Sequence, residues 1–303
     1  MKRRTFIKNT AATGTLLSLS GASLGFTAGP SQKHITILHT NDMHSHIDPF
    51  PADDAKYPNQ GGMARRATLI QAIRKENPHL LLLDAGDVFQ GTPYFNFYGG
   101  ELEFKLMSMM GYDAMTLGNH DFDNGLSGLL SQLPHAKFDI LSANYDFSNT
   151  ILDGYTKPYR IFEKDDVKIG VFGIGIALGG LVHRPLYKET KYLDPIEMAQ
   201  HTADELRHTK KCDIVICLSH LGFKYPNEHL ISDQTLAANT SDIDLIIGGH
   251  THTFLEKPLI AQNKKGKFVL INQAGWGGIQ LGRIDFYLDA SKNLSTSSTY
   301  FDL

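Results

Sequence analysis

Short hydrophobic runs alternate along this chain with amphipathic segments, and most of the runs end abruptly in polar residues. The runs have the length of β-strands and predict strands at residues 34–40, 80–83, 113–117, 138–144, 214–218 and 244–247. Apolar residues recur at helical spacing between some of these runs, which predicts helices at residues 61–74, 101–110 and 194–211. The run Leu80–Leu83 is apolar throughout, so we expect a strand that is covered on both faces. This order of strands and helices is typical of an α/β protein.

The pattern changes in the second half of the chain. Residues 159–163 and 167–174 flank the short polar segment 164–166, which predicts a β-hairpin and an antiparallel step between two halves of a layered fold. Two further strands are predicted at residues 267–272 and 282–288. The glycine-rich segment between them, residues 273–278, would let the backbone pass close to a neighbouring site.

Composition and charge narrow the possible functions. With 303 residues, 42% of them hydrophobic, the chain suits one large α/β domain or two small ones. Its formal charge is −3 and residues 1–28 contribute +4, so the remainder carries −7 (−3 minus +4). An acidic body argues against a partner such as duplex nucleic acid, which requires a basic surface. Cys212 and Cys217 would lie ~16 Å apart along one strand, too far for a disulfide, and are expected to be buried free thiols.

Residues 1–28 have the pattern of an export signal. Arg3 and Arg4 are followed by Phe6, Ile7 and Lys8, and then by a mildly apolar run rich in Ser, Thr and Gly. This resembles a twin-arginine signal and predicts a periplasmic or otherwise exported protein that uses the twin-arginine export machinery. The run is too polar for a membrane span, and no cysteine follows it that could carry a lipid, so no stable membrane anchor is expected.

Side chains that commonly bind metal ions follow the predicted strands. Five strand ends carry them in order: Asp42 and His44; Asp87; Asn119 and His120; His220; His250 and His252. A carboxylate and an imidazole two residues apart on an extended segment point the same way, so both can reach one ion. The carboxyl ends of parallel strands are also where α/β proteins place their chemistry. The recurrence of this layout predicts a metal site.

Several other polar or aromatic residues have a simpler interpretation. Side chains expected to support the fold or brace the site are His39, His46, Asp84, Ser142 and Asn144. The aromatic stretch at residues 93–100 is expected to form a loop that covers the helix after it, although it could stack on a substrate ring. Solvated surface charge is the expected state of five conceivable phosphate contacts, Arg65, Arg66, Arg160, His183 and Arg184.

The metal-type blocks, taken in order, resemble those of the calcineurin-like metallophosphoesterases. Within that family the chain looks most similar to the amino-terminal catalytic domain of the periplasmic 5′-nucleotidases and UDP-sugar hydrolases. The residues that carry this resemblance are 38–44 (LHTNDMH), 86–92 (GDVFQGT) and 118–123 (GNHDFD), together with the Gly-His-Thr-His block at 249–252. The resemblance covers residues 35–288 and implies a single catalytic domain, 29–303, folded as a four-layer α/β/β/α sandwich of two mixed sheets.

The resemblance also implies a role for each residue at the site. Two divalent ions, ~3.5–4 Å apart, would activate a water that attacks phosphorus directly. Asp42, His44 and His252 would bind one ion, Asn119, His220 and His250 the other, and Asp87 both. Mixed oxygen and nitrogen ligands suit Mn, Zn, Co or Fe. Asn119 and His120 would contact the substrate, and His120 would protonate the leaving oxygen. Asp123 is expected to hold the His120 ring, with Asp121 as the alternative.

The implied function is that of an exported dinuclear-metal hydrolase of phosphomonoesters, with 5′-nucleotides as the expected small-molecule substrates. The alternatives are a phosphodiesterase acting on cyclic nucleotides or UDP-sugars, a hydrolase of sulfur-linked adducts, and a non-catalytic metal-binding or interaction module on the same fold. The two-domain nucleotidases continue with a second domain that holds the base. Only 15 residues (303 minus 288) follow the last predicted strand here, so we expect that domain to be absent and the nucleotide specificity to stay open.

Overall fold

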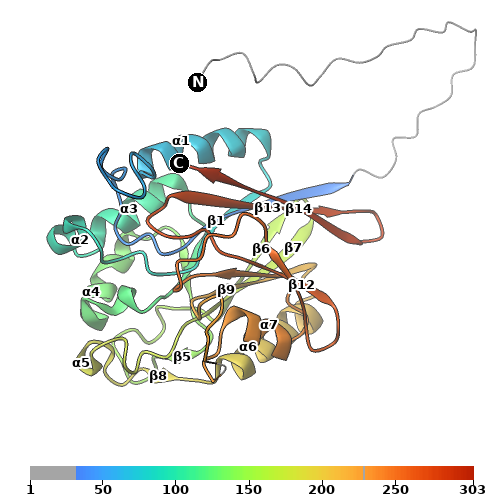
Figure 1. Ribbon diagram of the computed structural model, residues 1–303. Coiled ribbons are helices and arrows are strands. Elements are labelled where there is room, and N and C mark those ends of the chain that lie inside the picture. Colours follow the sequence, from blue (N-terminus) through green and yellow to red (C-terminus); the bar gives the residue numbers. More distant parts are fainter. Residues whose placement is uncertain (1–31, 228) are drawn as a thin grey trace, which may run out of the picture. The chain divides into compact units, whose positions relative to one another are not determined.

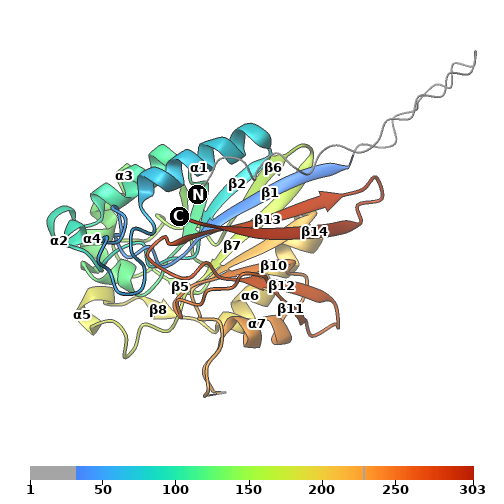
Figure 2. The same cartoon turned by 45° about the horizontal axis from the view of Figure 1, so that its top comes forward.

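Two six-stranded sheets lie face to face in the computed structural model, which describes residues 32–227 and 229–303 (Figures 1 and 2). Helices cover the outer face of each sheet, so the described residues form four layers. This confirms the predicted α/β/β/α sandwich. The predicted export signal, residues 1–28, lies outside the described residues.

The first sheet has the strand order β14-β13-β1-β2-β3-β4. Its strands are β1 (Lys33–Thr40), β2 (Leu80–Asp84), β3 (Ala114–Thr116), β4 (Asp139–Leu141), β13 (Gln280–Leu288) and β14 (Leu294–Asp302). β1, β2, β3 and β4 run parallel, whereas β13 pairs antiparallel with both β1 and β14. The segments that follow β1, β2 and β3 therefore leave the sheet at the same edge.

The second sheet has the strand order β11-β12-β10-β9-β7-β6. Its strands are β6 (Tyr159–Lys164), β7 (Val167–Ile174), β9 (Ile214–Ser219), β10 (Leu245–Gly248), β11 (Leu259–Gln262) and β12 (Phe268–Asn272). β7, β9, β10 and β12 run parallel, and the edge strands β6 and β11 are antiparallel to their neighbours. The predicted hairpin at residues 159–174 is thus the pair β6–β7.

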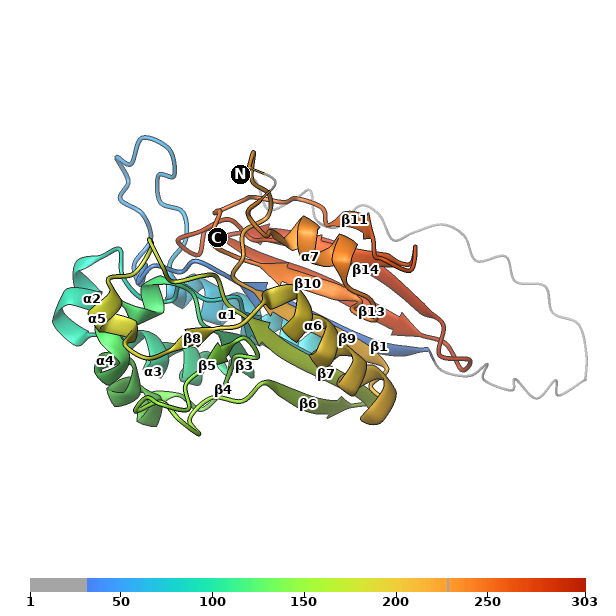
Figure 3. The ribbon, with the colours of Figure 1, turned by 90° about the horizontal axis from the view of Figure 1, so that it is seen from below.

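The helices fall into two groups, one on each outer face. Those on the side of the first sheet are α1 (Met63–Glu76), α2 (Pro93–Tyr98), α3 (Glu101–Met110) and α4 (Gly125–Gln132). Those on the second sheet are α6 (Pro195–Asp204), continued by a π-helical turn (Glu205–Thr209), and α7 (Asp233–Asn239), as Figure 3 shows. A short helix, α5 (Arg184–Tyr187), and a small sheet of β5 (Tyr145–Asp146) and β8 (Lys191–Tyr192) lie between. Among the described residues, no helix is both long and apolar enough to cross a bilayer.

The central strands of both sheets are buried on both faces, which explains their apolar sequences. Ile35 and Ile37 of β1 lie in the core between the sheets, whereas Leu38 faces the helices of the first layer. In β9, Ile216 faces the other sheet and Cys217 faces α6 and α7. Side chains alternate in this way because successive residues of a strand point to opposite faces. Cys212 and Cys217 are both free and buried, as predicted.

Three details differ from the prediction. The last strand is β14 rather than β13, and sequence periodicity misses it because it is an exposed edge strand with the polar sequence LSTSSTYFD. The aromatic stretch forms the short helix α2 instead of a loop, with Pro93 in its first turn. Arg66 is fully buried against the first sheet, where it donates a hydrogen bond to the carbonyl of Gly278 (3.2 Å), so its predicted exposure was wrong.

Candidate metal centre and active site

All seven predicted metal ligands come together at the carboxyl ends of parallel strands. The first sheet contributes Asp42 and His44 after β1, Asp87 after β2 and Asn119 after β3; the second contributes His220 after β9 and His250 and His252 after β10. These side chains form two groups, each with ligand atoms within 4.8 Å of one another.

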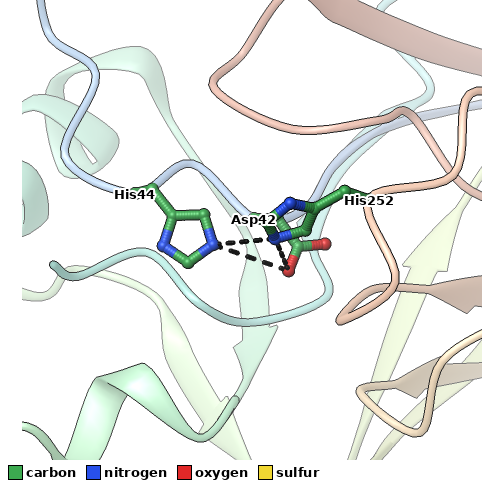
Figure 4. A group of neighbouring side chains, drawn as sticks. All are labelled: Asp42, His44 and His252. Atoms are coloured by element: carbon green, nitrogen blue, oxygen red, sulfur yellow. Dashed lines mark hydrogen bonds and ion pairs between the residues drawn. The ribbon is translucent and has the colours of Figure 1, made fainter. Parts of the chain in front are cut away.

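The first group consists of Asp42, His44 and His252 (Figure 4). Nε2 of His44 lies 3.0 Å from Nε2 of His252. Oδ1 of Asp42 lies 3.5 Å from Nε2 of His252 and 4.0 Å from Nε2 of His44. Ligand atoms that share one ion at ~2.0–2.2 Å are themselves ~3–4.4 Å apart, so this spacing suits a single cation.

The second group consists of Asp87, His220 and His250, with Asn119 beside them. Oδ2 of Asp87 lies 3.0 Å from Nε2 of His220, and Oδ1 of Asn119 lies 2.8 Å from Nδ1 of His250. The same Asp87 oxygen is 4.0 Å from Nε2 of His44 in the first group. Asp87 therefore lies between the two groups and within reach of both.

The backbone at these positions is held in an unusual conformation. Five of the seven predicted ligand residues have a positive φ, at Asp42 (49°), His44 (47°), Asp87 (56°), His250 (72°) and His252 (51°). A non-glycine residue in this region costs about 1–3 kcal/mol and persists only where surrounding structure enforces it. At these five positions the surrounding structure holds the backbone in an unfavourable conformation that directs the side chains into the site.

Two loops approach closely at the site, and this approach requires glycine. A Cβ atom on Gly118 would overlap Oδ1 of Asp87 and lie 2.6 Å from its backbone nitrogen. A Cβ atom on Gly86 would lie 2.6 Å from the backbone nitrogen of Gly118 and 2.9 Å from Nδ1 of His220. The glycines that precede Asp87 and Asn119 thus allow the ends of β2 and β3 to meet.

Backbone carbonyls fix the orientation of two of the ligand rings. Nδ1 of His44 lies 3.0 Å from the carbonyl oxygen of Gln90, and Nδ1 of His220 lies 2.7 Å from that of Ala85. A carbonyl can only accept a hydrogen bond, so each Nδ1 carries the proton. Each Nε2 is therefore the ring nitrogen that faces the other predicted ligands, and it can bind a metal ion once it carries no proton.

The donor set fits divalent metal ions. Burial acts to lower the pKa of His220, but the Asp87 carboxylate, 3.0 Å from its Nε2, and Asp42 raise it to about 10, so an ion bound there would displace the Nε2 proton. Burial lowers the pKa of His44 and lowers that of His250 to about 4, which keeps both rings neutral near pH 7. Burial acts to raise the pKa of Asp87, but His220, His44 and His120 together hold it well below its ordinary range. Neutral imidazoles and ionised carboxylates are the states that a metal site requires.

His120 lies at the rim of the site without belonging to either ligand group. Its Nδ1 is 2.8 Å from Oδ2 of Asp123, and this hydrogen bond, opposed in part by burial, raises the pKa of His120 above its ordinary value. Asp121 instead accepts hydrogen bonds from four backbone N–H groups, those of Asp87, Val88, Phe89 and Gly118. Asp123 is therefore the carboxylate that contacts the His120 ring, and Asp121 holds the two loops together.

A cavity of about 330 Å³ opens over the two groups. Its lining includes His44, Asp87, Asn119, His120 and Trp276. The Trp276 ring stacks on that of His252, with centroids 5.6 Å apart and planes 8° apart. Residues 273–278 therefore reach the site, as the sequence suggested. The contact is made by the side chain of Trp276, which the glycine pattern did not predict.

Two further supporting residues escaped the sequence analysis. Asn41 donates hydrogen bonds to Oδ2 of Asp42 and to the carbonyl of Gly275 (both 2.6 Å). Gln273 donates to the carbonyl of Gly249 (2.7 Å) and so steadies the loop that carries His250 and His252. Both residues lie within segments that the sequence analysis singled out, 38–44 and 273–278, although it assigned neither of them a role.

The five residues expected to support the fold or brace the site lie in different parts of the structure and make different contacts. His39 is buried beside Asn272 (3.2 Å), and burial lowers its pKa to about 4. His46 stacks on Phe50, with ring centroids 4.4 Å apart. The remaining three, Asp84, Ser142 and Asn144, bind backbone N–H groups of strand-end loops, those of Gly86, Tyr145 and Gly175. Four of the five predicted surface charges are exposed, Arg65, Arg160, His183 and Arg184.

Comparison with known proteins identifies the family. The model of the calcineurin-like phosphoesterase family matches residues 35–254. The chain is 38% identical over 298 residues to the snake venom 5′-nucleotidase of Crotalus adamanteus, a match that covers 91% of this chain and 49% of that protein. The crystal structure of a 5′-nucleotidase precursor from Thermus thermophilus has a TM-score of 0.81 at 33% identity, covering 89% of this chain and 55% of that one. The calcineurin-like phosphoesterase YfkN from Bacillus subtilis has a TM-score of 0.72 at 27% identity, covering 90% and 91%.

These similarities extend over nearly all of the described residues. The chain spans about half the length of the curated relatives that it matches, which include the human 5′-nucleotidase (34% identity, 52% of that protein). The matched range contains both ligand groups and the His120–Asp123 pair. The protein belongs to the calcineurin-like phosphoesterase family, whose members use divalent metal ions.

Proposed function

We propose that the protein is a metal-dependent phosphomonoesterase with two divalent ions at the site and with 5′-nucleotides as its first candidate substrates. The observation that carries this proposal is the position of Asp87 between two groups of imidazoles and carboxylates, beside a histidine that belongs to neither group. The 5′-nucleotidases among its relatives support the choice of substrate.

Each ion would be held by residues from both sheets. Asp42, His44 and His252 would hold one ion, Asn119, His220 and His250 would hold the other, and Asp87 would contribute to both. Such a pair supplies an activated water as nucleophile and neutralises the charge on the phosphoryl oxygens. Mixed nitrogen and oxygen donors suit Mn, Zn, Co or Fe. The buried Nε2 of His220 lies 3.0 Å from Oδ2 of Asp87, a spacing that suits two ligands of one cation.

His120 is the residue placed to act on the leaving group. Its ring lines the cavity, and Asp123 binds Nδ1, which leaves Nε2 free to donate a proton to the departing oxygen. Asp123 stabilises the protonated ring, as the raised pKa of His120 indicates. The Asn119 side chain and the imidazolium of His120 would bind the phosphoryl group.

We also propose that the protein is exported. The twin-arginine pattern at Arg3 and Arg4 supports this proposal, as does a body whose two cysteines are free. A fusion of residues 1–31 to a reporter that is active only after twin-arginine export tests it. Signal that depends on the export machinery and is lost when Arg3 and Arg4 are changed to Lys would support export, and no signal would refute it.

Turnover by the metal-loaded protein tests the proposed activity. After reconstitution with Mn or Zn, release of phosphate from AMP and from p-nitrophenyl phosphate is expected, with slower turnover of bis-p-nitrophenyl phosphate. A His120→Ala variant should keep its metal but lose about 10²–10⁴-fold in kcat, the usual contribution of a general acid. Preference for the diester would favour the phosphodiesterase alternative. If the metal-loaded protein hydrolyses no phosphoester, the hydrolase of sulfur-linked adducts and the non-catalytic module are the alternatives that remain.

A further inference from the structure

A second cavity, of about 500 Å³, adjoins the metal centre. Its lining includes Ile176, Leu181, Tyr192, Leu221, Tyr225 and Ile231. We propose that this cavity binds the part of the substrate that leaves with the oxygen, and that this part is an uncharged aromatic ring such as a nucleobase. The inference rests on the proposed phosphomonoesterase activity and assigns its ring-binding site to this domain.

The two cavities share one of the predicted metal ligands. His250 lines both of them. Leu221 directly follows the ligand His220, whose backbone N–H donates to the carbonyl of Ile174 (2.8 Å) at the end of β7, and Ile176 lies two residues beyond. The strand ends that place the metal ligands therefore also build the wall of the second cavity. A phosphate bound at the metal centre would leave the rest of the substrate beside this wall.

The chemistry of the lining selects for an uncharged, apolar group. Within residues 32–227 and 229–303, no Asp, Glu, Lys or Arg side chain lines the cavity. Its volume lies within the ~300–1,000 Å³ that small-molecule sites occupy. A phosphate or a sugar would gain little from such walls, whereas a flat ring would bury apolar surface against them.

Exposed apolar side chains gather at this cavity. Leu181 is 49% exposed, Leu230 50% and Tyr192 38%, and all three line it. Contiguous exposed apolar groups beside a polar site are typical of a ligand-binding surface. The Tyr225 hydroxyl donates to the carbonyl of Leu221 (2.6 Å), which fixes the tyrosine ring as a rigid wall. An aromatic wall next to aliphatic side chains suits the face of another ring.

The test compares substrates that share one leaving oxygen. AMP and UMP carry a base on ribose 5-phosphate, so their kcat/KM relative to ribose 5-phosphate measures the contribution of the base without a change in leaving-group chemistry. We expect a preference of about ten-fold or more for the nucleotides, expressed mainly in KM. Leu181→Ser and Leu230→Ser should each remove most of this preference and leave the turnover of ribose 5-phosphate unchanged.

The matched control is Ile260→Ser, which removes an equally exposed aliphatic side chain (63%) from β11, outside the cavity, and should not change the preference. Equal kcat/KM for the nucleotides and ribose 5-phosphate would overturn the inference while the phosphomonoesterase proposal stands. A preference that survives in both cavity variants would also overturn it and would favour a second domain or a partner protein as the occupant of this surface. If the metal-loaded protein hydrolyses none of the three compounds, the proposed function itself fails.

Discussion

Replacing Asp123 with asparagine tests the hydrogen bond between Asp123 and His120, the histidine that belongs to neither ligand group. Nδ1 of His120 lies 2.8 Å from Oδ2 of Asp123, and the two side chains are 36% and 28% exposed. Asparagine keeps an acceptor oxygen but loses the charge. A hydrogen bond to a charged partner contributes about 1.5–3 kcal/mol, and solvent screening at this exposure reduces the effect to about 1–2 kcal/mol. Because 1.36 kcal/mol is a factor of ten in rate, Asp123→Asn should lower kcat by about 5- to 30-fold.

Steady-state kinetics with AMP at saturating metal measure this change, alongside the metal content and the melting temperature, which should both stay at wild-type values. Asp121→Asn is the matched control. Its amide nitrogen would face backbone N–H groups that the carboxylate now binds, so we expect a loss of stability of about 1–3 kcal/mol. An Asp123→Asn variant with wild-type kcat would refute the role of this pair, and so would one that loses metal in parallel with activity.

Three further predictions concern the metal centre. Gly118→Ala should reduce metal content and activity together, because the added Cβ overlaps Asp87, whereas Gly179→Ala, whose Cβ meets no atom within 4 Å, should keep its metal. Removing metal with a chelator should lower the melting temperature by about 5–10 °C, and an unchanged value would indicate that no ion is bound. Trp276 is the single tryptophan and stacks on His252, so its fluorescence should change when metal is added back to wild type but much less in His252→Ala; equal responses would place the ion elsewhere.

The fold and the convergence of the predicted ligands were largely predictable because both depend on local patterns. Strands buried on both faces are continuously apolar, as in Leu80–Leu83, and their ends are marked by the first polar residues. Parallel strands then bring these ends together without any information about side-chain packing. The edge strand β14 carries no such signal, because a strand that is exposed along most of its length does not need apolar residues.

What the sequence could not provide are contacts between side chains from distant segments. The resemblance favoured Asp123 as the partner of His120 and left Asp121 as the alternative, and it is the turn at residues 120–122 that brings Asp123 to the ring. The stacking of Trp276 on His252 depends on the path of a glycine-rich loop that has no periodicity. Burial of Arg66 likewise follows from the rotation of α1 on the sheet, which helical spacing fixes only approximately.

The central claim is that Asp87 joins two metal sites, and the number of ions bound per chain tests it most directly. Mass spectrometry of metals in the reconstituted and desalted protein should give two divalent ions per chain for wild type. Asp87→Asn should bind both ions more weakly, because its side chain lies within reach of His220 at 3.0 Å and His44 at 4.0 Å. One ion or none in the wild-type protein, or an Asp87→Asn variant that retains two with unchanged affinity, would contradict this account.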